Sequence, residues 1–199
     1  MDEHDNTGGH DELAELVDAA RDGDRAAFDD LVRRTYVDTY TLALRLTSHE
    51  EDARDVVQEA YLRAWKGLSR FRGDAQFTTW LYRITANAAF THGQKRRRHR
   101  GSSLDDVDEP VDVRAESSPE LVAEARAGLE DVADALRQLP ERLRQVVVLK
   151  DVYELSHEDI AQEAGISVAA AKVRLHRGRK RLRDLLYERP EPGRSERAM

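Results

Sequence analysis

Residues 52–65 read Asp-Ala-Arg-Asp-Val-Val-Gln-Glu-Ala-Tyr-Leu-Arg-Ala-Trp, and this stretch shows most clearly how the chain folds. Its apolar residues recur from Ala53 to Trp65 at alternating steps of three and one, which is the spacing of one helical face. Helical spacing continues along the rest of the sequence, and we find no sustained alternation of the kind that predicts strands. The sequence therefore predicts an all-α protein.

The other face of this predicted helix is polar with one apolar residue. It presents Asp55, Gln58, Glu59 and Leu62 at helical spacing. Nothing inside the domain needs a face of this mixed chemistry, so we expect it to bind a partner.

Composition excludes several classes of protein. The 199 residues carry 39 acidic and 32 basic side chains, a net charge of −7, and the longest purely aliphatic run, residues 146–149, is too short to span a membrane. The acidic first twelve residues do not resemble a secretory signal, so we expect a cytoplasmic protein without membrane insertion. Cysteine is absent and the histidines lack metal-binding spacing, so we expect no metal, no cofactor and no enzymatic activity.

The charged residues are arranged in blocks that predict the domain organisation. Residues 95–100 carry five positive charges, residues 101–125 carry eight acids and one base, and residues 172–183 carry seven bases and no acid. Basic blocks are candidate nucleic-acid surfaces, although a solvated helix face is the alternative for any one of them. We expect two small helical domains at 11–100 and 119–188, a flexible acidic linker at 101–118, a disordered acidic tail at 1–10 and a second tail at 189–199.

The second predicted domain has the features of a helix-turn-helix. We expect Pro140 in the first turn of one helix, Ser156 as the cap of a short helix, Gly165 in a tight turn and Ser167 as the cap of a basic last helix. In this motif the second helix lies in the major groove of DNA. A helical hairpin with a charged surface is the alternative.

Aromatic residues alternate with arginines in residues 71–83, between the helix at 52–65 and a helix expected from Thr78 to about Arg98. This combination suits unpaired bases, which stack on rings while cations hold the phosphates. The other interpretation is an ordinary core, in which Trp65 and Trp80 are mainly buried.

Several motifs in order across both domains resemble one family, the extracytoplasmic-function (ECF) sigma factors of bacterial RNA polymerase. The resemblance covers about residues 27–98 and 129–186, and the two domains look like sigma regions two and four. Its markers are Asp55-Val-Val-Gln58-Glu59, Phe71-Arg72-Gly73-Asp74, Thr79-Trp80-Leu81-Tyr82-Arg83-Ile84 with Asn87, Leu155-Ser156, Glu158-Asp159-Ile160-Ala161, Gly165-Ile166-Ser167 and Lys172-Val173-Arg174-Leu175-His176-Arg177.

The resemblance implies a transcription initiation factor that binds the polymerase core at the clamp of its largest subunit and at the flap, and that catalyses nothing itself. It further implies promoter DNA as a second partner and an anti-sigma factor as a third. The residues implied for core binding are Asp55, Gln58, Glu59 and Leu62. Those implied for melting and reading the minus-ten element are Phe71, Arg72, Asp74, Gln76, Phe77, Trp80, Arg83, Asn87, Lys95, Arg96 and Arg97. Those implied for the minus-thirty-five element are Ser167, Lys172, Val173, Arg174, His176, Arg177 and Lys180.

The sequence departs from the family pattern at a few positions. Ala169-Ala170-Ala171 and Val173 stand where hydroxyl-bearing residues are common, and Thr91-His92-Gly93 replaces a common Asp-x-Leu. These departures bear on which residues contact DNA more than on the resemblance to the family.

Two other classes of function remain as hypotheses. A stand-alone helix-turn-helix regulator would need a dimer interface, for which the sequence offers no heptad seam. A helical enzyme would have Asp55 and Glu59 as its best carboxylates, without an accompanying nucleophile or metal set.

Overall fold

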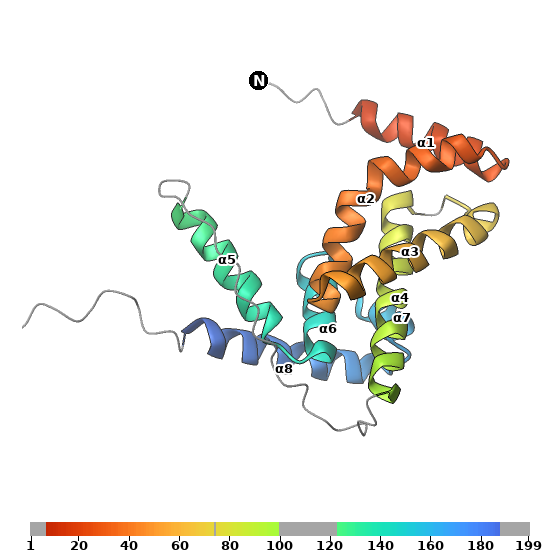
Figure 1. Ribbon diagram of the computed structural model, residues 1–199. Helices are drawn as coiled ribbons and strands as arrows, with labels where there is room; N and C mark the ends of the chain where they lie inside the picture. The colour runs from red at the N-terminus through yellow and green to blue at the C-terminus, as the bar shows by residue number, and fades with distance from the viewer. Residues whose placement is uncertain (1–6, 74, 100–122, 188–199) are drawn as a thin grey trace, which may run out of the picture. The chain divides into compact units, whose positions relative to one another are not determined.

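The computed structural model describes residues 7–73, 75–99 and 123–187 (Figure 1). These residues form helices joined by turns, and no strand occurs among them, so the all-α prediction is confirmed. The helices belong to two compact units, one carrying α1–α4 and the other α5–α8. The predicted linker at 101–118 and tail at 189–199 lie outside the described residues.

The first unit consists of α1 (Thr7–Arg21), α2 (Arg25–Thr47), α3 (Glu50–Gly67), the short 3-10 helix η1 (Leu68–Arg70) and α4 (Phe77–His99). Helix α1 begins at Thr7, earlier than the start expected at residue 11, so the predicted tail at 1–10 is wrong for residues 7–10. No proline interrupts these residues, and the backbone hydrogen bonds of the helix can therefore continue through them.

The start of α2 is fixed by Asp24, whose Oδ1 accepts hydrogen bonds from the backbone N–H groups of Ala26 and Ala27 at 2.8 and 3.2 Å. Such an N-cap satisfies donors that have no partner inside the helix. The acidic residue in the turn before the helix therefore sets where α2 begins.

Buried threonines on α2 show how polar groups are tolerated in this core. The hydroxyls of Thr35, Thr39 and Thr47 each donate to the carbonyl one turn earlier, at 2.7–2.9 Å. The phenol oxygen of Tyr61, on α3, lies 2.9 and 3.2 Å from the Thr35 and Thr39 hydroxyls. Burial raises the pKa of Tyr61, and the phenol therefore stays protonated inside the unit.

The second unit consists of α5 (Ala123–Arg137), α6 (Glu141–Asp151), α7 (His157–Ala164) and α8 (Val168–Tyr187). Pro140 is the N-cap of α6, not a residue of its first turn as expected. Its ψ of 135° is extended, and its carbonyl accepts hydrogen bonds from the N–H groups of Leu143 and Arg144. The ring of proline allows this conformation because it restricts φ alone.

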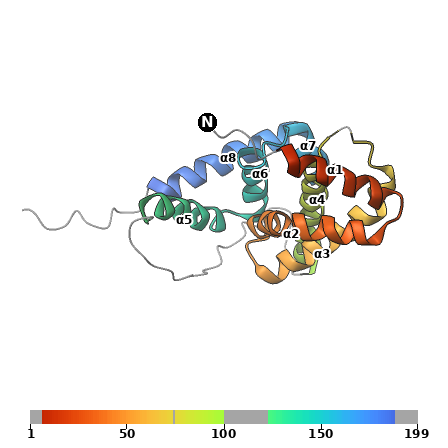
Figure 2. The same cartoon turned by 90° about the horizontal axis from the view of Figure 1, so that it is seen from above.

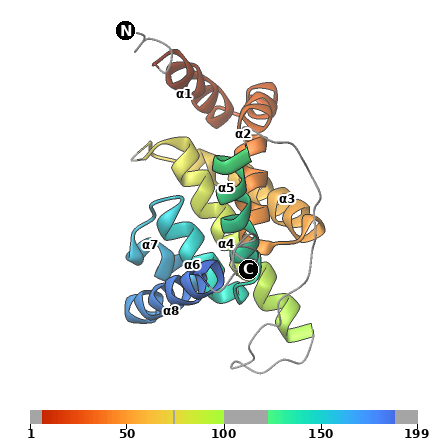
Figure 3. The ribbon, with the colours of Figure 1, turned by 90° about the vertical axis from the view of Figure 1, so that its left-hand side faces the viewer.

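The helix-turn-helix predicted from the capping residues is confirmed (Figure 3). The hydroxyl of Ser156 accepts a hydrogen bond from the N–H of Asp159 at 3.0 Å, and that of Ser167 accepts from the N–H of Ala170 at 3.1 Å. Gly165 between the two helices has a φ of +64°, a left-handed conformation that glycine adopts without strain.

Helix α8 packs against α6 and α5 (Figure 2), and its buried residues are Ala171, Leu175 and Gly178. The contact with α6 is close: a Cβ added at Gly178 would lie 2.6 Å from Cγ2 of Val147 and 3.3 Å from the carbonyl oxygen of Leu143. The missing side chain of this glycine therefore lets α8 approach α6 and fixes which face of α8 points outward.

Exchange of Gly178 for alanine should lower the free energy of unfolding of the second unit by up to about 2 kcal/mol. Crowding of a packed interior costs about 1–3 kcal/mol, which exceeds the gain of about 1 kcal/mol in helix propensity. Urea unfolding followed by circular dichroism measures the change. Ala169→Gly, at an exposed position of the same helix, measures the difference in helix propensity alone. A higher unfolding midpoint for Gly178→Ala than for the wild type would contradict the close contact.

Candidate nucleic-acid and partner interfaces

Helix α3 carries the predicted partner-binding face. Asp55, Gln58, Glu59 and Leu62 are all exposed, and 48% of the surface of Leu62 is accessible. Their spacing places them on one side of α3, while the buried residues Val56, Ala60 and Ala64 occupy another side. The exposed mixed face expected from the sequence is therefore present, with two carboxylates and one large apolar side chain.

Glu59 on this face is held by Arg63, one helical turn away. The Nε of Arg63 donates to Oε1 of Glu59 at 2.6 Å. This hydrogen bond is the main cause that lowers the pKa of Glu59, and the positive charges of Arg63, Lys95 and Lys66 act in the same direction. Glu59 is therefore ionised at neutral pH.

Arg63 also crosses from α3 to α4, which the sequence analysis did not anticipate. Its Nη1 donates to Oδ1 of Asn87 at 2.6 Å. One feature of the sequence could have indicated the pairing of Arg63 with Glu59. Arg63 is a basic residue four positions after Glu59, and this spacing is typical of a helical ion pair. The bond to Asn87 joins residues 24 positions apart and depends on the packing of two helices.

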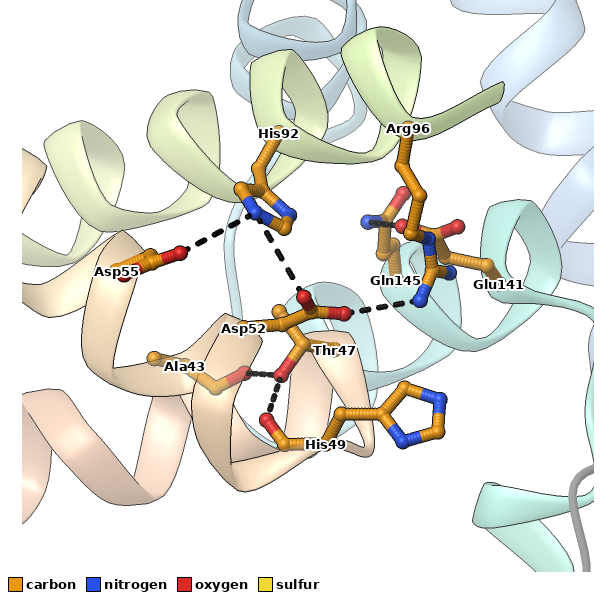
Figure 4. Close-up of polar contacts among 9 residues, drawn as sticks. All are labelled: Ala43, Thr47, His49, Asp52, Asp55, His92, Arg96, Glu141 and Gln145. Atoms are coloured by element: carbon orange, nitrogen blue, oxygen red, sulfur yellow. Dashed lines mark hydrogen bonds and ion pairs between the residues drawn. The ribbon is translucent and has the colours of Figure 1, made fainter. Parts of the chain in front are cut away.

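A second polar link joins the other ends of α3 and α4 (Figure 4). Asp52 lies between two side chains of α4: its Oδ2 accepts a hydrogen bond from Nη1 of Arg96 at 2.9 Å, and its Oδ1 is 3.7 Å from Nε2 of His92. The same His92 nitrogen lies 3.9 Å from Oδ2 of Asp55. Below Asp52 in this view, the hydroxyl of Thr47 donates to the carbonyls of Ala43 and His49 at the junction of α2 and α3.

This link changes the interpretation of the basic end of α4. The sequence analysis assigned Lys95, Arg96 and Arg97 alike to DNA, but Arg96 is half-buried and held by Asp52, so the structure gives it a part in joining the helices. Lys95 is exposed and Arg97 is half-buried. Lys95 is therefore the most accessible of these three cations.

The segment before α4 differs from the expectation for its aromatic residues. Phe71 and Phe77 are only 8% and 6% exposed, and each packs against Trp80, with ring centroids 4.9 and 5.8 Å apart. Apolar rings leave water when neighbouring rings can cover them, so these two phenylalanines support the segment from inside. Arg72 and Gln76 are exposed, and the predicted site residue Asp74 lies outside the described residues.

Trp80, Arg83 and Asn87 follow one another at steps of three and four, so they share a face of α4. All three are half-buried. The Trp80 ring lies over Gly67 at the end of α3, where an added Cβ would be 3.4 Å from the ring. Trp80 and Trp65 are therefore mainly buried, as the core interpretation expects, and each keeps a partly exposed edge.

An open, largely apolar pocket of about 630 Å3 lies beside this segment, between α1 and the start of α4. Leu13, Val17 and the ion-paired residues Asp18 and Arg21 of α1 form one wall, and Phe71 and Phe77 contribute to another. Helix α1 thus contributes to this pocket, which no pattern in the sequence indicated.

Helix α8 presents most of the predicted minus-thirty-five residues outward. The exposed ones are Ser167, Lys172, Val173, His176, Arg177 and Lys180, and Arg174 is half-buried. Arg179 instead forms a two-pronged ion pair with Asp151 of α6, with Nε donating to Oδ2 at 3.0 Å. This hydrogen bond raises the pKa of Arg179. The exposed cations near the start of α8 therefore lie around the apolar side chain of Val173.

Within residues 12–73, 75–99 and 130–187, no three histidine or acidic side chains gather closely enough to hold a metal ion. In the part of the chain that the structure describes, no helix is both long and apolar enough to cross a membrane.

Comparison with known families assigns both units to one class. The family described as "Sigma-70 region 2" matches residues 31–99, and "Sigma-70, region 4" matches residues 129–182. These ranges coincide with α2–α4 and with most of α5–α8. These two matches together cover more than half of the chain and show that it is a sigma factor of the sigma-70 class.

Similar curated proteins narrow the class. The chain is 35% identical over 184 residues to the RNA polymerase sigma-H factor of Pseudomonas aeruginosa, covering 87% of this chain and 95% of the relative. It is 34% identical to the ECF RNA polymerase sigma-E factor of Escherichia coli, covering 82% and 88% of the two chains. It is also 34% identical to the ECF sigma factor SigE of Mycolicibacterium smegmatis, of which it covers only 64%. The chain belongs to the ECF sigma factors.

Two solved structures are similar in fold. One is CnrH in complex with the cytosolic domain of CnrY, with a TM-score of 0.54, 29% identity and coverage of 90% of this chain and 99% of that one. The other is the sigma factor RpoE in complex with the anti-sigma factor NepR from Bartonella quintana, with a TM-score of 0.56, 25% identity and coverage of 80% and 96%.

Exchange of Arg96 for alanine should affect the stability of the first unit, whereas exchange of Lys95 for alanine should affect DNA binding. Arg96→Ala leaves the half-buried Asp52 without its hydrogen bond and should destabilise the first unit by about 1 kcal/mol in urea unfolding. Lys95→Ala should leave unfolding unchanged and lower the slope of log affinity against log salt by about one when the polymerase-bound protein binds promoter DNA. The reverse pattern would contradict the division of labour between the two cations.

Proposed function

We propose that this protein binds RNA polymerase core through α3, opens and reads the minus-ten element with the face of α4, and reads the minus-thirty-five element with α8. The observation that carries the proposal is the row formed by Asp55, Gln58, Glu59 and Leu62, whose members are all exposed on a helix that buries Val56, Ala60 and Ala64 on its inner side. A stand-alone DNA-binding protein has no use for such a surface.

The chemistry of the α3 row suits a basic partner surface. Asp55 and Glu59 supply negative charge, and the pKa of Glu59 is lowered by its contact with Arg63, so its charge persists at neutral pH. Leu62 adds an apolar side chain that a partner can cover, which combines charge complementarity with burial. The clamp of the largest polymerase subunit is the partner that sigma-factor family membership indicates, and we propose the flap as the partner of the second unit.

The face of α4 suits single-stranded DNA. A partly exposed Trp80 can stack on an unpaired base while Arg83 and Lys95 neutralise phosphates, and Asn87 can donate to a base edge. Flipping a base out of the duplex costs a few kcal/mol, which a pocket must repay. A pocket between α1 and the start of α4 has Phe71 and Phe77 in its walls, and both of these rings pack against Trp80.

The exposed face of α8 suits the major groove of duplex DNA. Lys172, His176 and Arg177 lie near the start of the second helix of a helix-turn-helix, where base contacts are usual. Lys180 lies farther along and is better placed for phosphates. The net charge of −7 opposes DNA binding by the free chain, so we expect promoter recognition to require the polymerase.

We also propose an anti-sigma factor as a regulatory partner, a cytoplasmic location and the absence of any catalytic activity in this chain. The support for an anti-sigma factor is that a similar solved structure contains one, NepR, bound to its sigma factor. The support for a non-catalytic function is that sigma factors supply promoter specificity to an enzyme that itself makes the RNA.

In vitro transcription with purified bacterial core polymerase, this protein and fragmented genomic DNA tests the proposal. We expect RNA starts that depend on the protein and share two upstream motifs. Replacing Asp55 and Gln58 together by alanine should abolish most of these starts and weaken core binding at least tenfold, while helicity measured by circular dichroism stays the same.

A matched control is Asp29→Ala with Asp30→Ala. It removes one exposed and one half-buried carboxylate from α2 and leaves the α3 row intact. Protein-dependent starts with this control but not with the α3 variant identify the row as the interface. Unchanged core binding by the α3 variant, or sequence-specific operator binding by the free chain, would contradict the proposal and favour a stand-alone regulator.

Arg177→Ala should weaken recognition of the upstream motif by about 1–3 kcal/mol, because Arg177 is exposed where the recognition helix enters the groove. The measurement is initiation from promoters with matched and scrambled upstream motifs. Arg179→Ala is the matched control, since its guanidinium is already bound to Asp151, and it should leave the preference for the upstream motif unchanged. Equal preferences in wild type and Arg177→Ala would remove Arg177 from the reading surface.

A further inference from the structure

Arg63 touches both proposed interfaces of the first unit at once. Its Nε is 2.6 Å from Glu59, which belongs to the α3 row, and its Nη1 is 2.6 Å from Asn87, which belongs to the α4 face. We propose that Arg63 is a positioning residue that sets the orientation of the Asn87 amide and couples it to the binding of polymerase at Glu59. This inference rests on the function proposed above and assigns a residue that the sequence analysis did not include.

The geometry of the guanidinium group allows Arg63 to couple Glu59 to Asn87. It is planar and rigid, so the nitrogen that binds Glu59 and the nitrogen that binds Asn87 cannot rotate independently. A movement of Glu59 therefore turns the plane that holds Asn87. The ammonium group of lysine is a compact point charge on a flexible chain and cannot pass on an orientation in this way.

The bond to Arg63 decides which part of Asn87 is presented. An asparagine amide can offer either its oxygen, an acceptor, or its nitrogen, a donor. Because Oδ1 of Asn87 accepts from Arg63, the amide turns its nitrogen, a donor, to the other side. The group that Asn87 reads should thus be a hydrogen-bond acceptor on a base edge, such as a ring nitrogen or a carbonyl oxygen.

The bond to Glu59 links this orientation to the polymerase. Glu59 is ionised and already paired, so a cationic side chain of the core that approaches it competes with Arg63. Any change that core binding makes in the Arg63–Glu59 pair must reach Asn87 through the same guanidinium. By thermodynamic reciprocity, DNA contact at Asn87 must then also affect the binding of the core.

Arg54 on the same helix provides a comparison within the molecule. It forms the same kind of pair one turn apart, with Nη2 of Arg54 2.8 Å from Oε2 of Glu50. Arg54 is exposed and outside both proposed interfaces, whereas Arg63 reaches across to α4. Substitution of Arg54 therefore removes a helical ion pair without disturbing Asn87.

The experiment compares Arg63→Ala, Arg63→Lys and Arg54→Ala as complexes with core polymerase. Initiation is measured on a promoter found by the transcription experiment and on copies with single-base changes through its minus-ten element. We expect Arg63→Ala to lower the preference for the native base at one position about tenfold, the amount that one good base contact supplies. Arg63→Lys should lose most of this preference, and Arg54→Ala should keep it.

Two further readouts separate positioning from a merely structural contribution. The double variant Arg63→Ala with Asn87→Ala should discriminate no worse than Asn87→Ala alone, because both act on one contact. Core affinity of Arg63→Ala should not fall, since the substitution removes a competitor for Glu59. Thermal unfolding monitors folding, and Arg63→Lys, which retains the charge, gives the same test if Arg63→Ala unfolds.

Each outcome decides something. If initiation by Arg63→Ala falls equally on all templates, or if core affinity falls with it, Arg63 only stabilises the unit and the inference is overturned while the proposed function stands. If the effects of Arg63→Ala and Asn87→Ala add independently, the coupling is likewise overturned. If wild-type protein gives no protein-dependent starts at all, the proposed function fails, and this inference fails with it.

Discussion

The packing of α3 against α4 is the constraint on which the proposed interfaces of the first unit depend. Small and branched residues such as Val56, Ala60 and Ala64 fill the inner side of α3, so the helix can rotate little without opening the core. Polar links hold the two ends, Asp52 to Arg96 and Arg63 to Asn87. With that rotation fixed, the carboxylates of α3 and the aromatic and basic face of α4 are held in one geometry.

In the second unit, helix caps, a glycine turn and a close helix contact fix which face of α8 points outward. Caps at Ser156 and Ser167 begin the two helices of the helix-turn-helix, and the left-handed Gly165 sets the turn between them. The absence of a side chain at Gly178 brings α8 close to α6. Since the inner side of α8 is fixed by that contact, the exposed cations on its outer side keep a defined position relative to one another.

Sequence patterns located the exposed row of α3 correctly. They did not reveal the burial and the side-chain partners of several other residues. Periodicity separates an inner from an outer face of one helix, which is why Asp55 and Leu62 were placed correctly. It cannot tell whether an aromatic residue in a loop faces solvent or a neighbouring ring, and so it did not indicate that Phe71 and Phe77 are buried. Arg96 was grouped with its basic neighbours because its partner, Asp52, is 44 residues away in the chain.

The sequence by itself determined the helical class, the two domains, the helix-turn-helix and the outward row on α3, because helical periodicity, capping residues and glycine turns act over a few neighbouring residues. Only the tertiary structure decided how Arg63 is used, which cations of α4 remain accessible, and that α1 contributes to a pocket beside the start of α4. Those features depend on side chains from different helices meeting at hydrogen-bonding distance. Such meetings are set by how the helices pack, and no local pattern in the chain records them.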